Sequence, residues 1–273
     1  MTLLRFVAVI LSLPGLTLAQ AQTGGIEFTV RVTPTVGRAE PALQLSCYLL
    51  RKSFAEIRKE ADEAEPRPDL DDFVDALEGS LQLKAWMKRN KTVRLNGEEF
   101  ARQATVDDVF EVPEFFDAFI TQNAGDLRFP APKYTDRDRA KNPEKYERMR
   151  QEYREQLRKH ARDNPHTLVG MEIHLTEVDA GQRWAREEDL RRQRVRHRSL
   201  QLAQTKYLAA RTETDLEGRA VLVNIPAGEY WLSTLENDAA AGDVRLRWDT
   251  PVAVQAGRVT RLELSNVNAV PPK

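Results

Sequence analysis

The hydrophobic periodicity of this chain changes twice, and these changes constrain the fold more than any other feature. Apolar and polar residues alternate over residues 26–33 and again over 43–49, the period of a half-buried β-strand. From residue 54 the apolar spacing becomes helical and stays so to about residue 165. The sequence therefore predicts a β-hairpin followed by a helical segment.

Start and stop signals divide the helical segment. Ser53 and Glu56 resemble a capping box, and Pro113 and Asn142-Pro143 are typical of the first turns of two further helices. Residues 125–141 predict a long loop. The expected buried faces are Phe116, Phe119 and Ile120 after Pro113, and Tyr146, Met149, Tyr153 and Leu157 after Pro143. Residues 54–165 are thus interpreted as an α-helical insertion, because they are too long and too regularly patterned for a linker.

Strand periodicity returns after residue 165. Val169, Met171, Ile173 and Leu175 alternate with polar residues and predict a strand, residues 182–203 predict a charged helix, and residues 204–214 fit either helix or strand. Short strands are then expected at 219–225, 229–235, 244–248, 252–254 and 259–264. Seven or eight short strands favour a mainly β sandwich, built from residues 24–53 and 166–270 and interrupted by the insertion.

A family resemblance lies within this C-terminal part. The segments Thr-Glu-Thr-Asp-Leu-Glu-Gly-Arg-Ala (212–220) and Asn-Ile-Pro-Ala-Gly-Glu-Tyr-Trp (224–231) resemble bacterial carboxypeptidase regulatory-like domains, relatives of the B-type repeats of collagen-binding surface proteins. The resemblance implies a transthyretin-like (prealbumin-like) sandwich and, by analogy, a binding or structural module. Some such repeats carry a Lys–Asn crosslink. Asn266 and Asn268 stand near the expected place, but residues 26–33 contain no Lys, so no crosslink is expected here.

The N-terminus has the pattern of a cleavable signal peptide. Arg5 precedes an apolar run over residues 6–18, and the small-x-small site Ala19-Gln20-Ala21 follows. The run is shorter than the ~20 residues of a membrane span. We therefore expect residues 1–21 to be removed, no membrane span in the mature chain, and an extracytoplasmic protein, periplasmic or secreted.

Composition and motifs predict neither catalytic residues nor a metal or cofactor site. The formal net charge of −1 gives no general attraction for nucleic acid. Cys47, the single cysteine, alternates with leucines and is expected to point into the core, and the four histidines lack metal-ligand spacing. A hydrolase would need a pair of catalytic carboxylates, and the sequence does not indicate which two of its 42 acidic residues would meet in space. A hydrolase of envelope glycan or peptide, with a site between insertion and sandwich, therefore remains an alternative.

A basic segment is the most distinctive local feature. It is either a polyanion-binding surface or a solvated helix with Glu–Arg pairs four residues apart. The leading hypothesis is a non-enzymatic binding or scaffold module of the bacterial envelope, with an envelope protein or glycan as partner and with the insertion and this segment as its binding surface. The candidate binding residues are Arg191, Arg192, Arg194, Arg196 and Arg198.

Overall fold

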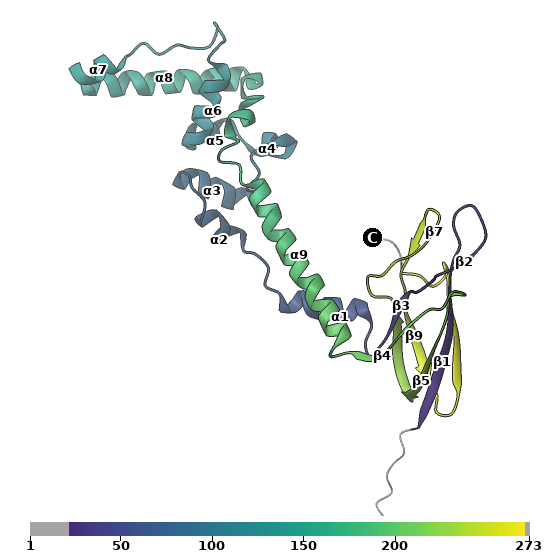
Figure 1. The fold of residues 1–273 in the computed structure, drawn as a ribbon. Coiled ribbons are helices and arrows are strands. Elements are labelled where there is room, and N and C mark those ends of the chain that lie inside the picture. Colours follow the sequence, from purple (N-terminus) through teal and green to yellow (C-terminus); the bar gives the residue numbers. More distant parts are fainter. Residues whose placement is uncertain (1–21, 271–273) are drawn as a thin grey trace, which may run out of the picture. The chain divides into compact units, whose positions relative to one another are not determined.

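A computed structural model describes residues 22–270, so the predicted signal peptide, 1–21, lies outside the described residues. The chain forms two compact units, one from residues up to Ala64 and from Val195 onward, the other from Glu65–Arg194 (Figure 1). It is 45% helical and 22% strand, in several small sheets. The expectation of a mainly β sandwich is therefore wrong, because helices account for twice as much of the chain as strands.

The first unit contains two four-stranded sheets, whose buried side chains form one hydrophobic core. In one, β1 (Thr23–Val32) runs parallel to β10 (Val259–Leu264) and antiparallel to β5 (Arg219–Pro226) and β2 (Glu40–Pro41). The other has the order β4 (Leu208–Glu213), β3 (Ser46–Leu50), β6 (Gly228–Ser233) and β9 (Asp249–Val254), and a small hairpin joins β7 (Ala239–Ala241) to β8 (Val244–Leu246).

The hairpin predicted for the first two strands is wrong. β1 and β3 belong to different sheets, because the connection between them pairs Pro41 with Arg31 and then passes through Gln44, whose φ is 50°. The side chains that the apolar–polar alternation predicts to be buried are nevertheless buried, because Phe28 of β1 and Cys47 of β3 lie in the same core. Within residues 204–214, whose pattern fits either helix or strand, β4 begins at Leu208.

Helix α1 (Phe54–Ala64) belongs to this unit rather than to the helical insertion. Its capping box is present. The Ser53 hydroxyl oxygen accepts from the Glu56 backbone N–H, and the Glu56 carboxylate accepts from the backbone N–H and the hydroxyl of Ser53. A second acceptor comes from β9, where the Asp249 carboxylate accepts from the backbone N–H groups of Phe54 and Ala55 at 3.1 and 3.3 Å. Ile57 is fully buried in a small cluster that anchors α1 to this unit.

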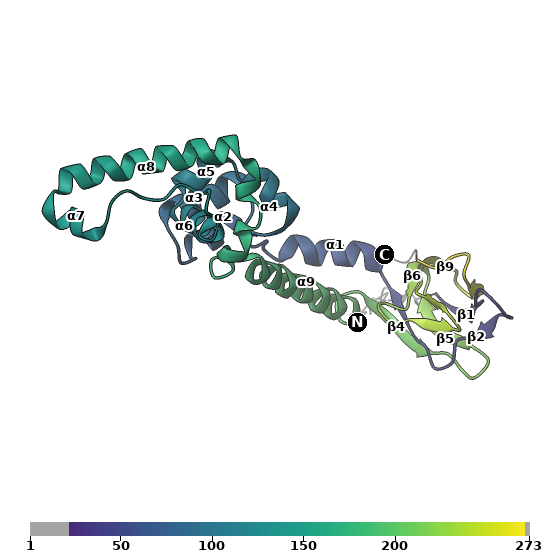
Figure 2. The same ribbon diagram turned by 90° about the horizontal axis from the view of Figure 1, so that it is seen from above.

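The second unit is helical and packs around edge-to-face aromatic rings. Trp86 lies 5.1 Å from Phe115, and Phe100 lies 5.4 Å from Phe115, between ring centroids. Figures 1 and 2 show α7 folded back along the N-terminal part of α8. The α-helices are α2 (Leu70–Asp75), α3 (Leu81–Asn90), α4 (Gly97–Gln103), α5 (Val106–Glu111), α6 (Pro113–Asn123), α7 (Asp136–Lys141), α8 (Pro143–Asp163) and the first part of α9 (Gly181–Gln204).

The strand predicted over residues 169–175 is also wrong. The segment instead forms the 3₁₀-helix η2 (Met171–Leu175), and another 3₁₀-helix, η1 (Pro165–Leu168), directly precedes it. Met171 and Leu175 are buried, whereas Val169 and Ile173 are 73% and 69% exposed, so the buried spacing is four rather than two. Gly170, with φ of 88°, turns the chain so that η2 packs on α6, which extends the helical unit beyond the predicted boundary at residue 165.

Helix α9 confirms the expectation of a charged helix after residue 182. Across residues 22–270, none of the helices has both the length and the apolar character that crossing a bilayer requires.

Candidate functional site

The five arginines of the predicted binding segment lie along α9, and their side chains have partners within the protein. In the helical unit, Arg191 donates to the backbone carbonyl of Glu65 through Nε at 3.3 Å and Nη2 at 3.1 Å. Arg194 forms an ion pair with the Glu65 carboxylate at 3.5 Å, and Arg192 pairs with Asp189. These contacts anchor the first part of α9 within the helical unit.

The other two arginines of the segment lie in the β-containing unit. Arg196 forms an ion pair with Glu236, whose side chain is 16% exposed, and Arg198 is not without a partner either. A polyanion would have to compete with these internal contacts. The binding role of the segment stays a prediction.

The structure places Cys47 and His160 in packed surroundings. Cys47 is fully buried, and burial raises the pKa of its thiol to about 12, so the thiolate nucleophile is suppressed. His160 packs edge-on against Phe129, with ring centroids 5.6 Å apart. Within the described chain, no group of three or more His, Cys, Asp or Glu side chains is placed to hold a metal ion.

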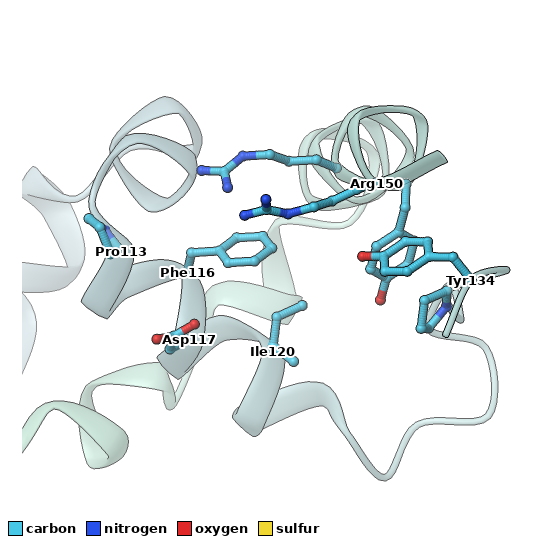
Figure 3. A pocket seen from close by; sticks show the side chains of 9 residues that line it. Pro113, Phe116, Asp117, Ile120, Tyr134 and Arg150 are labelled. Atoms are coloured by element: carbon cyan, nitrogen blue, oxygen red, sulfur yellow. The ribbon is translucent and has the colours of Figure 1, made fainter. Parts of the chain in front are cut away.

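A pocket of about 530 Å³ lies within the helical unit, between α6, α8 and the loop that precedes α7 (Figure 3). In Figure 3, Phe116 and Ile120 point from α6 towards Arg150 and Tyr134. Its walls combine apolar, aromatic and charged side chains. They are Pro113, Phe116, Asp117, Ile120, Pro132, Tyr134, Arg150, Tyr153 and Arg154.

Helix geometry explains why these residues meet. Residues 113, 116, 117 and 120 share one face of α6, and residues 150, 153 and 154 share one face of α8, because neighbours on a helix surface are three and four residues apart. Pro113 starts α6, and Asn142 caps α8 by accepting from the Lys145 backbone N–H at 3.0 Å. The two helices that form these walls therefore begin at the start signals expected from the sequence.

The tyrosines form an edge-to-face series along one side of the pocket. The Tyr134 ring lies 5.9 Å from Tyr153 and 5.1 Å from Tyr146, at interplanar angles of 76° and 78°. The Tyr153 hydroxyl donates to the Pro130 carbonyl at 3.0 Å and ties the loop to α8. Burial raises the pKa of both Tyr134 and Tyr153, so both phenols stay neutral, and among the described residues the Tyr134 hydroxyl has no hydrogen-bond partner.

Arg154 is the most constrained cation of the pocket. Its guanidinium lies over the Phe116 ring, 4.6 Å from the centroid, and donates to the backbone carbonyl of Phe110. Burial, followed by repulsion from Arg158 and Arg150, lowers its pKa below the ordinary value. No carboxylate lies within ion-pair distance of Arg154 in the part of the chain that the structure covers.

The other charged groups leave the pocket incompletely neutralised. Arg150 is paired with Glu147 at 3.4 Å, and both side chains are about half exposed. Asp117 is the single carboxylate of the lining, so two arginines against one aspartate give a lining charge of +1. Glycoside hydrolysis generally needs two carboxylates at the scissile bond.

Sequence reasoning missed this pocket because its residues resemble ordinary structural ones. Phe116, Ile120 and Tyr153 were assigned to buried helix faces, whereas each is only partly buried. Arg150 and Arg154 are two of 41 basic residues. The sequence contains one signal for it. Arg150 and Arg154 are four residues apart and share a helix face with Tyr153, so that face carries two like charges beside an aromatic ring.

Comparisons with known proteins gave little. No protein-family model and no curated protein matches the chain. A solved structure from Pseudomonas aeruginosa, described as a candidate carbohydrate binding protein, is 11% identical, with 92% of each chain covered and a TM-score of 0.27. At that TM-score the likeness supports no conclusion about fold or function.

Proposed function

We propose that this chain is an exported, non-enzymatic binding protein of a bacterial envelope, and that the pocket between α6 and α8 binds a saccharide. Export rests on the signal-peptide pattern of residues 1–21. The resemblance of residues 212–231 to carboxypeptidase regulatory-like domains is in keeping with a binding module.

The observation that carries the proposal is the composition of the pocket. Phe116, Ile120 and Tyr134 supply apolar and aromatic surface, while the Tyr134 hydroxyl and the Asp117 carboxylate have no hydrogen-bond partner elsewhere in the described structure. A sugar ring has apolar C–H faces and a polar hydroxyl edge, so it can use both kinds of surface at once. The volume of about 530 Å³ is that of a small-ligand pocket.

An extended peptide fits the pocket less well. Strand addition would require a row of free backbone N–H and C=O groups, whereas the pocket is lined by side chains of two helices and a loop. The Phe110 carbonyl, which lies close by, already accepts from Arg154. Recognition here must therefore come from side chains, which suits a ligand with many hydroxyl groups.

A glycan array probed with the mature chain tests the proposal, followed by calorimetric titration of the oligosaccharides that bind. Tyr134→Ala removes the aromatic side wall and should weaken binding by about five- to thirtyfold, because the lost ring contacts are of the order of 1–2 kcal/mol. Tyr134→Phe, which keeps the ring, should lose less. Leu127→Ala is the control, since Leu127 is in the same loop, is fully exposed and does not line the pocket.

Two outcomes would contradict the proposal. If no glycan binds, or if Leu127→Ala weakens binding as much as Tyr134→Ala does, the pocket is not a saccharide site. If the bound oligosaccharide is cleaved and new reducing ends accumulate, the protein is a hydrolase rather than a binding module.

A further inference from the structure

The arginines of the pocket bear on which saccharide it would select. Arg150 and Arg154 are one helical turn apart on α8, and both line the pocket. With Asp117 as the single lining carboxylate, the lining carries a net positive charge. Glu147 pairs with Arg150 from outside the lining, but Arg154 has no ion-pair partner among the described residues, so a ligand carboxylate would supply one and a neutral sugar would not.

Arg154 is held ready for an anion by contacts that do not neutralise it. The Phe116 ring supports one face of the guanidinium, and the Phe110 carbonyl accepts one of its N–H groups. A guanidinium has five N–H donors in a fixed plane, so donors remain for a ligand and their orientation is set in advance. Burial strengthens the attraction for a ligand anion, because less water screens the charge.

Arg150 provides a second, more adaptable cation. Its ion pair with Glu147 is 3.4 Å long and solvent-exposed, with side chains 56% and 52% exposed, and pairs of this kind contribute little. Arg150 can therefore turn towards a bound carboxylate at small cost. Figure 3 shows Arg150 on the α8 side of the pocket, across from Ile120 of α6.

We infer that the ligand is an acidic saccharide, a uronic acid unit whose carboxylate is bound by Arg150 and Arg154 while its ring packs against Phe116 and Tyr134. The inference rests on the proposed function of the pocket. Asp117 and the Tyr134 hydroxyl bind hydroxyl groups at the opposite edge of the sugar. The distribution of charge thus orients the ligand, with its carboxylate towards α8.

The test compares matched ligands and matched variants of the mature chain. Short oligomers of galacturonate and of glucuronate are titrated beside their carboxyl-reduced counterparts, which keep the ring and lose the charge. The acidic form should bind at least about tenfold more tightly, as expected for a charge-assisted hydrogen-bonded pair. Arg150→Gln should reduce the preference for the acidic form without abolishing it, because Arg154 remains in the lining.

Arg148→Gln is the matched control. Arg148 lies on the same helix, is exposed, pairs with Glu152 at 3.9 Å and does not line the pocket, so its loss removes the same charge elsewhere. Arg154→Lys keeps the charge but not the planar donor array, and should weaken binding of the acidic form selectively. Thermal unfolding of each variant shows whether the helical unit is intact.

The possible results separate the two proposals. Equal affinity for acidic and reduced forms would overturn the uronate inference and leave the saccharide pocket in place. Equal losses in Arg148→Gln and Arg150→Gln would also overturn it, because the effect would then be a general charge effect of α8. If neither form binds, and the glycan array is negative as well, both proposals fall.

Discussion

Asp249 provides the sharpest test of how the β-containing unit is held together. Its carboxylate accepts from the backbone N–H groups of Phe54 and Ala55, the first residues of α1, across 195 positions of sequence in the case of Phe54. Asp249→Ala leaves these two donors without their acceptor. Loss of a helix-capping side chain costs about 1–2 kcal/mol, and the capping box of Ser53 and Glu56 keeps the expected loss within that range.

The pH dependence of this site has a definite sign. Burial raises the pKa of Asp249 above its ordinary value, despite the two N–H donors. The folded chain therefore holds the proton more tightly than the unfolded chain, whose aspartates titrate near ~3.9. The stability that Asp249 contributes is greatest below that pH and decreases as pH rises through the window up to the raised value. Asp249→Asn, which keeps an acceptor oxygen, should abolish this part of the pH dependence.

The assay combines denaturant midpoints with hydrogen exchange of residues 54–64, measured from about pH 3 to pH 7. Asp249→Ala should speed exchange in α1 at every pH, and Asp249→Asn should do so less. Unchanged exchange in Asp249→Ala would refute the capping role. An aspartate contribution that grows with rising pH would refute the argument that desolvation dominates.

Three further predictions concern other parts of the chain. Leu157→Ala removes a fully buried side chain of α8 and should destabilise the helical unit by about 2–5 kcal/mol in denaturant titration, and a smaller loss would mean that the site collapses around the cavity. Cys47 should resist maleimide at pH 8 in the folded chain and react after denaturation, because its pKa is about 12 when buried; rapid labelling of the native protein would contradict its placement. Changing both Arg194 and Arg196 to Gln should leave retention on an anionic glycan column nearly unchanged, since both are paired internally, whereas clearly earlier elution would favour the polyanion-binding role of α9.

Local signals were sufficient for much of the secondary structure. Pro113 and Asn142-Pro143 start helices where expected, and β5 and β10 cover the predicted segments. Residues 169–175 were assigned wrongly because an apolar residue at every second position also supplies the spacing of four that η2 buries. Periodicity indicates which side chains are buried but leaves the type of element open when a run is short.

Long-range pairing and the pocket lie beyond such signals. Nothing in residues 23–32 indicates that β1 pairs in parallel with the last strand of the chain. Likewise, Phe116 is expected to be core from the sequence, and the stacked guanidinium of Arg154, supplied by another helix, makes it part of the pocket wall. Both features depend on which elements meet, and that depends on packing of the whole unit.

The pairing of β1 has a consequence for biosynthesis. Its long neighbours, β5 and β10, both come from the last quarter of the chain, and the Asn266 side chain bonds to the backbone of Thr33 from 233 residues away. During vectorial synthesis, β1 therefore emerges before both of these neighbours and its edges stay unpaired until they follow, whereas residues 65–194 form a unit from their own contacts. Chaperone protection should thus matter most for the leading strand, and a polypeptide released before residue 259 would expose that strand to self-association.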